Sequence, residues 1–150
     1  MPIQSWYEKK WHRISGCGPT TAALITMYMA SAFPKSCAPL YPYALPAIKS
    51  DFIVHMNEVR EFVKPGGMGL TSTTFFAERT IAFAQSKGVK LQSYIVHTNL
   101  NAQNAFGFLQ EAVKEQYMPA LLILKNPFKE LSDFHWHWMA VTDLTMRNKV

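Results

Sequence analysis

The chain has 150 residues, 49% of them hydrophobic and 17% charged, with a formal net charge of +5. This composition is typical of one folded domain with a buried core, and it excludes a disordered chain. The basic residues are scattered and form no arginine-rich stripe, so we expect no nucleic-acid partner. No apolar run reaches the roughly 18 residues that span a bilayer, and the opening MPIQSWYEKKW lacks the apolar core of a signal peptide. We therefore expect no membrane-spanning segment and, by default, a cytoplasmic location.

The first half of the chain predicts three helices. Residues from about Pro19 to Ala32 are apolar on nearly all sides, which is typical of a buried helix. Apolar side chains recur at three- and four-residue steps from Ile48 to Val63, predicting an amphipathic helix that ends at the glycine-rich turn KPGGMG. Thr71 or Ser72 can cap a third helix that closes at Gly88.

The second half predicts strands and one more helix. The segment VKLQSYIV (89–96) is strand-like, and Asn101 opens a helix with one apolar stripe. After Pro119, the runs ALLILK and HWHWMAV predict two strands that are each buried on at least one face. Helices that come mostly before strands indicate an α+β fold, and we expect residues 1–150 to form a single domain.

Cys17 lies in the segment SGCGPTTAALI, directly before the first predicted helix. A thiol has an ordinary pKa of about 8.5, which falls near a helix N-terminus because the unpaired amides of the first turn favour the thiolate. Gly16 and Gly18 permit a tight turn and leave room for a substrate carbonyl, and Pro19 suits the first helical turn. The surroundings of Cys17 therefore predict a nucleophile.

The other cysteine, Cys37, lies in a stretch (34–46) that holds four of the nine prolines and predicts an irregular loop. Cys17 and Cys37 can pair as a disulfide, but two cysteines cannot form a four-thiolate zinc site. We interpret Cys37 as an incidental thiol.

A cysteine nucleophile needs a base, and the segment FHWHWMAVTD offers two histidines. His135 and His137 are two residues apart and would face the same side of a strand, so spacing alone does not separate them. A His-x-His pair is also compatible with metal binding, but no second pair or obvious carboxylate completes such a site, so we expect neither metal nor cofactor. The remaining histidines are interpreted as surface or capping residues: His12, His55 and His97.

Acyl transfer also needs a hydrogen-bond donor for the developing oxyanion. The backbone amide of Cys17 can be one donor. Gln4 is the only glutamine or asparagine before the cysteine, and its side-chain amide can be the other.

The ordered set of Gln4, GCGPTTAALITMY, GGMGLTST, SKGVKLQSY and HWMAVTD resembles the papain-like cysteine peptidases. It is most similar to the bacterial double-glycine leader peptidases of bacteriocin systems and their stand-alone relatives. The resemblance implies a papain-like fold with the nucleophile on a buried central helix, packed on a small antiparallel sheet. It also implies that Cys17 is the nucleophile, His137 the base and Gln4 the oxyanion donor, and that the substrate is a peptide or protein.

Two features depart from that pattern. Gln4 precedes Cys17 by 13 residues, a longer gap than in the leader peptidases themselves. The family also carries an orienting Asp or Asn further past the histidine than this chain extends, so that residue is missing, replaced or beyond Val150. Asp143 and Asn148 are the remaining candidates, and we expect the domain to be truncated at its C-terminus or fused to a larger protein.

Three functions stay open on the sequence. The first is a cysteine peptidase or related acyl-transfer enzyme using Cys17 and His137. The second is a non-catalytic relative that holds a peptide in the same cleft. The third is a scaffold protein in which GCGPTT only begins a helix. The loop around CAPLYPYALP and the three glycines of KPGGMG are candidates for lining a cleft.

Overall fold

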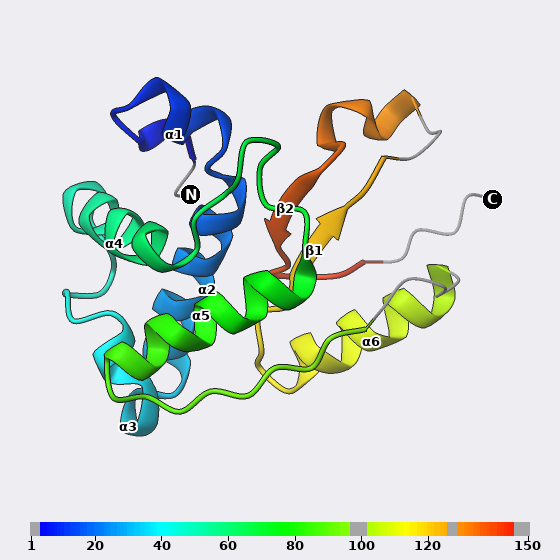
Figure 1. The fold of residues 1–150 in the computed structure, drawn as a ribbon. Coiled ribbons are helices and arrows are strands. Elements are labelled where there is room, and N and C mark those ends of the chain that lie inside the picture. The colour runs from blue at the N-terminus through cyan, green and yellow to red at the C-terminus, as the bar shows by residue number, and fades with distance from the viewer. Residues whose placement is uncertain (1–3, 97–101, 126–128, 146–150) are drawn as a thin grey trace.

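A computed structural model describes residues 4–96, 102–125 and 129–145. Within these residues the chain forms six α-helices and a two-stranded antiparallel sheet, which is an α+β architecture (Figure 1). The elements in chain order are η1 (Gln4–Trp6), α1 (Lys10–Ile14), α2 (Cys17–Ala32), α3 (Pro34–Cys37), η2 (Ala38–Leu40), α4 (Lys49–Phe62), α5 (Thr73–Ser86), α6 (Ala102–Lys114), β1 (Ala120–Ile123), η3 (Lys129–Phe134) and β2 (His137–Ala140).

Helix α2 is the centre of the fold. It packs against β2 on one side and against α4 and α5 on others (Figure 1). From Gly18 to Ala23 every residue of α2 is buried, whereas four of the apolar residues that predict a buried helix are only partly buried: Leu24, Ile25, Met27 and Met29. The first turns of α2 therefore lie inside the core, directly after Cys17.

The predicted helices at 48–63 and after Ser72 are confirmed as α4 and α5. The core face of α4 is formed by Phe52, Met56 and Val59, all fully buried, whereas Ile48 is exposed. The Ser72 side chain accepts a hydrogen bond from the Phe75 amide, so Ser72 is the N-cap of α5.

The strands differ in part from the predictions. β1 and β2 are present, and they pair antiparallel with Ile123 opposite His137. The predicted strand over 89–96 is wrong: this segment has no strand and is largely exposed, with Tyr94 84% exposed. The stretch 34–46 is less irregular than expected, since it contains α3 and η2, each beginning close to a proline. Helix α6 lies where a helix is predicted, and Asn101 lies outside the described residues.

Candidate active site

Cys17 is the first residue of α2, and its side chain is half-buried. The preceding residue, Gly16, is the N-cap and offers no side chain to the free amides of the first turn. The N-terminus of this buried helix therefore points its unpaired amides toward the start of the turn that carries the sulfur, an arrangement that favours negative charge.

The two glycines beside Cys17 are needed for packing. A Cβ on Gly16 would collide with the carbonyl oxygen of His12 and with the Tyr7 ring. A Cβ on Gly18 would lie 2.7 Å from a methyl group of Leu70. The space beside both glycines is filled by protein, so the expectation that they leave room for a substrate carbonyl is not supported at these two positions.

A pocket of about 230 Å³ opens beside Cys17. Trp136, the residue directly before His137, lies on its wall, and the loop at Gly67–Gly69 forms another side. Met68 on that loop is 89% exposed and Trp136 is 49% exposed. The pocket beside Cys17 is therefore bordered by large apolar side chains that are open to solvent. Among the described residues, the lining is Trp11, Ile14, Ser15, Cys17, Gly67, Met68, Gly69 and Trp136.

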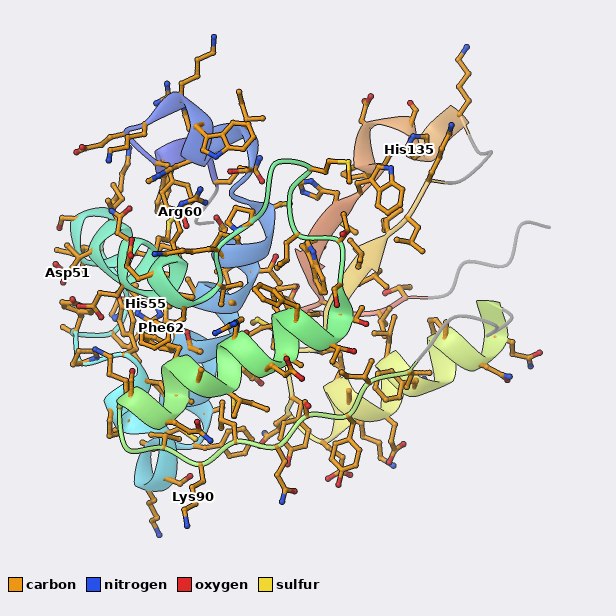
Figure 2. The ribbon with its side chains drawn as sticks, in the orientation of Figure 1. Asp51, His55, Arg60, Phe62, Lys90 and His135 are labelled. Atoms are coloured by element: carbon orange, nitrogen blue, oxygen red, sulfur yellow. The ribbon has the colours of Figure 1, made fainter. Side chains whose placement is uncertain are left out.

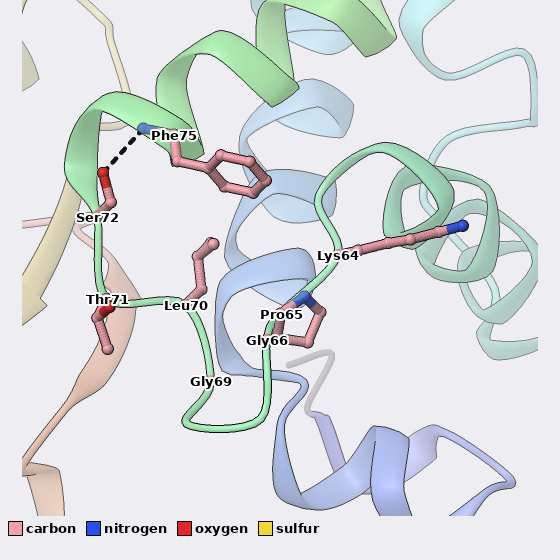
Figure 3. A pocket seen from close by; sticks show the side chains of 8 residues that line it. All are labelled: Lys64, Pro65, Gly66, Gly69, Leu70, Thr71, Ser72 and Phe75. Carbon is pink, nitrogen blue, oxygen red and sulfur yellow. Dashed lines mark hydrogen bonds between the residues drawn. The ribbon is translucent and has the colours of Figure 1, made fainter.

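A second pocket of about 440 Å³ adjoins the same glycine loop and shares Gly69 with the first (Figure 3). It is lined by Lys64, Pro65, Gly66, Gly69, Leu70, Thr71, Ser72 and Phe75. This pocket is larger but contains neither a cysteine nor a histidine, so the smaller one is the candidate site. The prediction that the glycines of KPGGMG line a cleft is confirmed, and neither pocket is lined by the 37–46 loop.

The glycine loop, residues 66–69, is a tight turn closed at both ends by backbone hydrogen bonds. The amides and carbonyls of Gly66 and Gly69 bond each other reciprocally at 3.0 Å, and Gly69 has a φ of +81° that favours glycine. Next along the chain, the Leu70 carbonyl accepts a hydrogen bond of 2.6 Å from the indole of Trp138. This bond ties the loop to β2.

His137 is the first residue of β2, and β2 packs directly against α2. Its ring is partly buried, and desolvation lowers the pKa of His137 from its ordinary value. No side-chain hydrogen bond joins His137 to the Cys17 thiol or to any other residue that the structure describes, and His137 is not among the described residues that line the Cys17 pocket. A neutral imidazole with free ring nitrogens can accept a proton.

His135 does not share a strand face with His137, so that expectation is wrong. It lies in a turn before β2 (Figure 2), and Trp136 between the two histidines has a φ of +56°. This left-handed residue breaks the two-residue alternation of a strand. The Nε2 atom of His135 is buried without a partner in the described part of the chain.

The expected helper residues are engaged elsewhere. The Gln4 side-chain amide donates a hydrogen bond of 2.8 Å to the carbonyl of Arg13. Asp143 is exposed, and its carboxylate accepts a bond of 2.7 Å from the amide of Leu144. Asn148 lies outside the described residues.

The other thiol and the other histidines are also placed. Cys17 and Cys37 are both free, so the disulfide does not form, and Cys37 is buried. His55 is fully buried in the core, which corrects its interpretation as a surface or capping residue. His12 is partly exposed on α1, and His97 lies outside the described residues.

Among the described side chains, no three His, Cys, Asp or Glu residues lie close enough together to hold a metal ion. In the same ranges, no helix has the length and apolar character needed to cross a membrane. No protein-family profile matches the chain, and no curated protein or solved structure shows significant similarity to it.

Proposed function

We propose that this protein is a papain-like cysteine peptidase or amide hydrolase in which Cys17 is the nucleophile and His137 the base. One observation carries the proposal. The cysteine begins a buried helix, and it shares a pocket with Trp136, directly before the histidine that begins the strand packed on that helix.

The chemistry uses these groups in sequence. His137 takes the thiol proton, and the sulfur of Cys17 attacks the substrate carbonyl carbon to form a tetrahedral intermediate. The C–N bond then breaks, the amine leaves with the proton from His137, and a thioester remains on Cys17. Water hydrolyses the thioester, which releases the acid and restores the thiol. The backbone amide of Cys17 is available as an oxyanion donor at the helix N-terminus.

The substrate is a peptide or protein that presents an extended segment to the pocket. The exposed rings and aliphatic groups around the sulfur suit apolar side chains, because their contact with Trp136 and Met68 removes apolar surface from water. No charged side chain lines this pocket among the residues that the structure describes.

Alkylation and acylation test the proposal. Iodoacetamide near neutral pH should modify Cys17 ahead of the buried Cys37, as peptide mapping would show. The activated ester p-nitrophenyl acetate should acylate Cys17 and leave one acetyl group on it as a thioester. Intact-protein mass spectrometry would show this added mass. His137→Ala should slow acylation by about 10²–10⁴-fold, the usual contribution of a general base, whereas the matched variant His135→Ala should retain it.

Two results would contradict this mechanism. One is alkylation of Cys37 while Cys17 stays unmodified. The other is an acylation rate that falls equally in the His135 and His137 variants, because equal losses would show that neither ring acts specifically.

The second candidate is a non-catalytic peptide-binding protein on the same scaffold. It is favoured by the side chains of Gln4 and Asp143, which bond to the Arg13 carbonyl and the Leu144 amide and not to the site. A peptide that binds at the pocket and is recovered uncut after long incubation, from a protein whose Cys17 does not acylate, would select this candidate.

A further inference from the structure

Four large apolar side chains meet at the Cys17 pocket although each of them is exposed to solvent. Their exposed fractions are 49% for Trp11, 61% for Ile14, 89% for Met68 and 49% for Trp136. They come from α1, from the glycine loop and from the turn before β2, which lie at the same end of the molecule (Figure 1). An exposed apolar cluster around a pocket typically marks a surface that binds a ligand or a partner.

The backbone of Trp136 has a conformation that tryptophan seldom adopts. Its φ of +56° lies in the left-handed region, and it stands two residues after η3 ends at Phe134. A helix commonly ends in a left-handed residue, but that residue is usually glycine or asparagine, because a Cβ is penalised there. Trp136 is half exposed, so core packing does not account for a bulky residue at this position. Strained residues of this kind concentrate at binding and catalytic sites.

The walls of the Cys17 pocket are suited to an aromatic group. Trp136 lies on one wall, directly before His137 in the chain. Trp11 and Met68 add a second indole and a thioether to the lining. Aromatic rings pack favourably against other rings and against thioether sulfur. An aromatic ligand would therefore gain specific contacts here in addition to the removal of apolar surface from water.

The size of the pocket also suits a single ring. Its volume is about 230 Å³. A closed apolar cavity of roughly 150 Å³ holds a benzene molecule, so this pocket has room for a ring of that size. During the proposed reaction, the part of the substrate that contains the attacked carbonyl stays bonded to the Cys17 sulfur. A side chain next to that carbonyl is therefore held beside the pocket.

We propose that Trp136 is a specificity-determining residue of the Cys17 site, and that the pocket binds an aromatic side chain on the acyl side of the scissile bond. This inference rests on the proposed role of Cys17 as the nucleophile. It narrows the substrate class to peptides in which an aromatic residue supplies the attacked carbonyl.

Three p-nitrophenyl esters with the same leaving group test this preference. The hydrocinnamate ester carries the side chain of phenylalanine without its amino group, the isocaproate ester carries that of leucine, and the acetate ester has none. Each ester transfers its acyl group to the Cys17 sulfur and releases p-nitrophenol, whose absorbance gives the acylation rate. The rate with Cys17→Ala is subtracted, and each rate is divided by that of the same ester with free N-acetylcysteine.

The compared quantity is the ratio of the hydrocinnamate rate to the acetate rate. In the parent this ratio should be at least about tenfold, a discrimination that hydrophobic pockets commonly reach, with isocaproate between the two. Trp136→Ala should lower the ratio by about threefold or more, because contact between two aromatic rings contributes a factor of this order. Tyr94→Ala removes an exposed ring that lines neither pocket and should leave the ratio unchanged.

The outcomes separate this inference from the proposed function. A parent in which acetate acylates Cys17 while the ratio is near one overturns the inference and leaves Cys17 as nucleophile. A parental ratio in Trp136→Ala does the same, even where all rates fall together, because a parallel loss shows that Trp136 acts only through the fold. An isocaproate rate equal to or above the hydrocinnamate rate overturns the aromatic preference. No acylation of Cys17 by any ester overturns both proposals.

If circular dichroism shows that Trp136→Ala does not fold, Trp136→Gly gives the same decision. Glycine adopts a positive φ without strain, so this variant removes the indole and suits the backbone at this position. The ratio should again fall by about threefold or more. An unchanged ratio in this variant would overturn the proposal.

Discussion

The indole of Trp138 lies nearly parallel to the ring of Phe76, with centroids 4.2 Å apart and an interplanar angle of 12°. The same indole donates its N–H to the Leu70 carbonyl at 2.6 Å. Trp138 is 3% exposed, so one side chain joins β2, α5 and the glycine loop inside the core. The position of β2, and with it His137, depends on these contacts.

Replacing Trp138 by Phe should distinguish the contribution of the ring stack to stability from that of the indole hydrogen bond. Phe retains an aromatic surface for Phe76 but leaves the buried Leu70 carbonyl without its donor. The free energy of unfolding should fall by about 1–3 kcal/mol, the cost of an unsatisfied buried polar group, as measured by urea titration. Trp136→Phe is the matched control at an exposed position and should change it by less than about 0.5 kcal/mol. Equal losses in the two variants would contradict this reading of the indole bond.

The glycines around Cys17 should differ in their tolerance of a methyl group. Gly16→Ala places its Cβ against backbone, which cannot move aside easily, and should destabilise the fold by about 3 kcal/mol. Gly18→Ala meets only the side chain of Leu70 and should cost less, about 1–2 kcal/mol. Gly107→Ala in α6, which meets nothing, should stabilise by about 0.5–1 kcal/mol. Thermal unfolding of the three variants gives the order, and a Gly18 variant less stable than the Gly16 variant would be inconsistent with it.

The helices could be predicted because their signals are local. The apolar residues of α2 and the three- and four-residue steps from Phe52 to Val59 mark faces that a single helix must bury. The Ser72 cap lies within one turn of the Phe75 amide that donates to it. These features need no knowledge of the partner element. The role of Cys17 as the first residue of a buried helix follows from the same kind of local pattern.

The failures concern contacts between distant segments. Alternation over 89–96 resembles a strand, but a strand needs a neighbour to pair with, and none pairs with this segment among the described residues. The His135 and His137 prediction assumed an extended Trp136, whereas Trp136 has a left-handed φ. The buried hydrogen bond from the Arg60 guanidinium to the Ser15 hydroxyl spans 45 residues, so no local pattern indicates it. An arginine within the apolar stripe of a helix was the only available signal.

His55 should make the stability of the fold depend on pH. Its Nε2 lies 2.9 Å from the Thr26 hydroxyl, its Nδ1 has no partner in the described residues, and burial lowers its pKa to about 4. The unfolded chain binds a proton near pH 6.5 and the folded chain only near pH 4, so stability is lost as the pH falls from 6.5 toward 4. The loss attributable to His55 should approach roughly 3 kcal/mol.

Urea titrations at pH 7.0, 5.5 and 4.5 measure this effect. His55→Gln keeps an amide donor for Thr26 but has no proton to gain, so its stability should fall less over the same interval. If the parent and this variant lose stability in parallel, the acid sensitivity comes from other groups.

The cap of α5 gives a further comparison between two adjacent hydroxyls. Ser72→Ala removes the acceptor of the Phe75 amide and should lower the free energy of unfolding by about 1 kcal/mol. Thr71→Ala, one residue earlier on the same exposed segment, should change it by less than about 0.5 kcal/mol. Chemical denaturation distinguishes them, and a larger loss at Thr71 would show that the cap is assigned to the wrong residue.

Leu70 contacts both β2 and α2, the strand that begins with His137 and the helix that begins with Cys17. Its carbonyl is held by the strand and its side chain rests on Gly18 of the helix, so one aliphatic group acts as the spacer between them. Substitutions at positions 18 and 70 should therefore depend on each other. Homologous sequences in which position 18 gains a side chain should carry a smaller residue at position 70, and the two should co-vary across evolution.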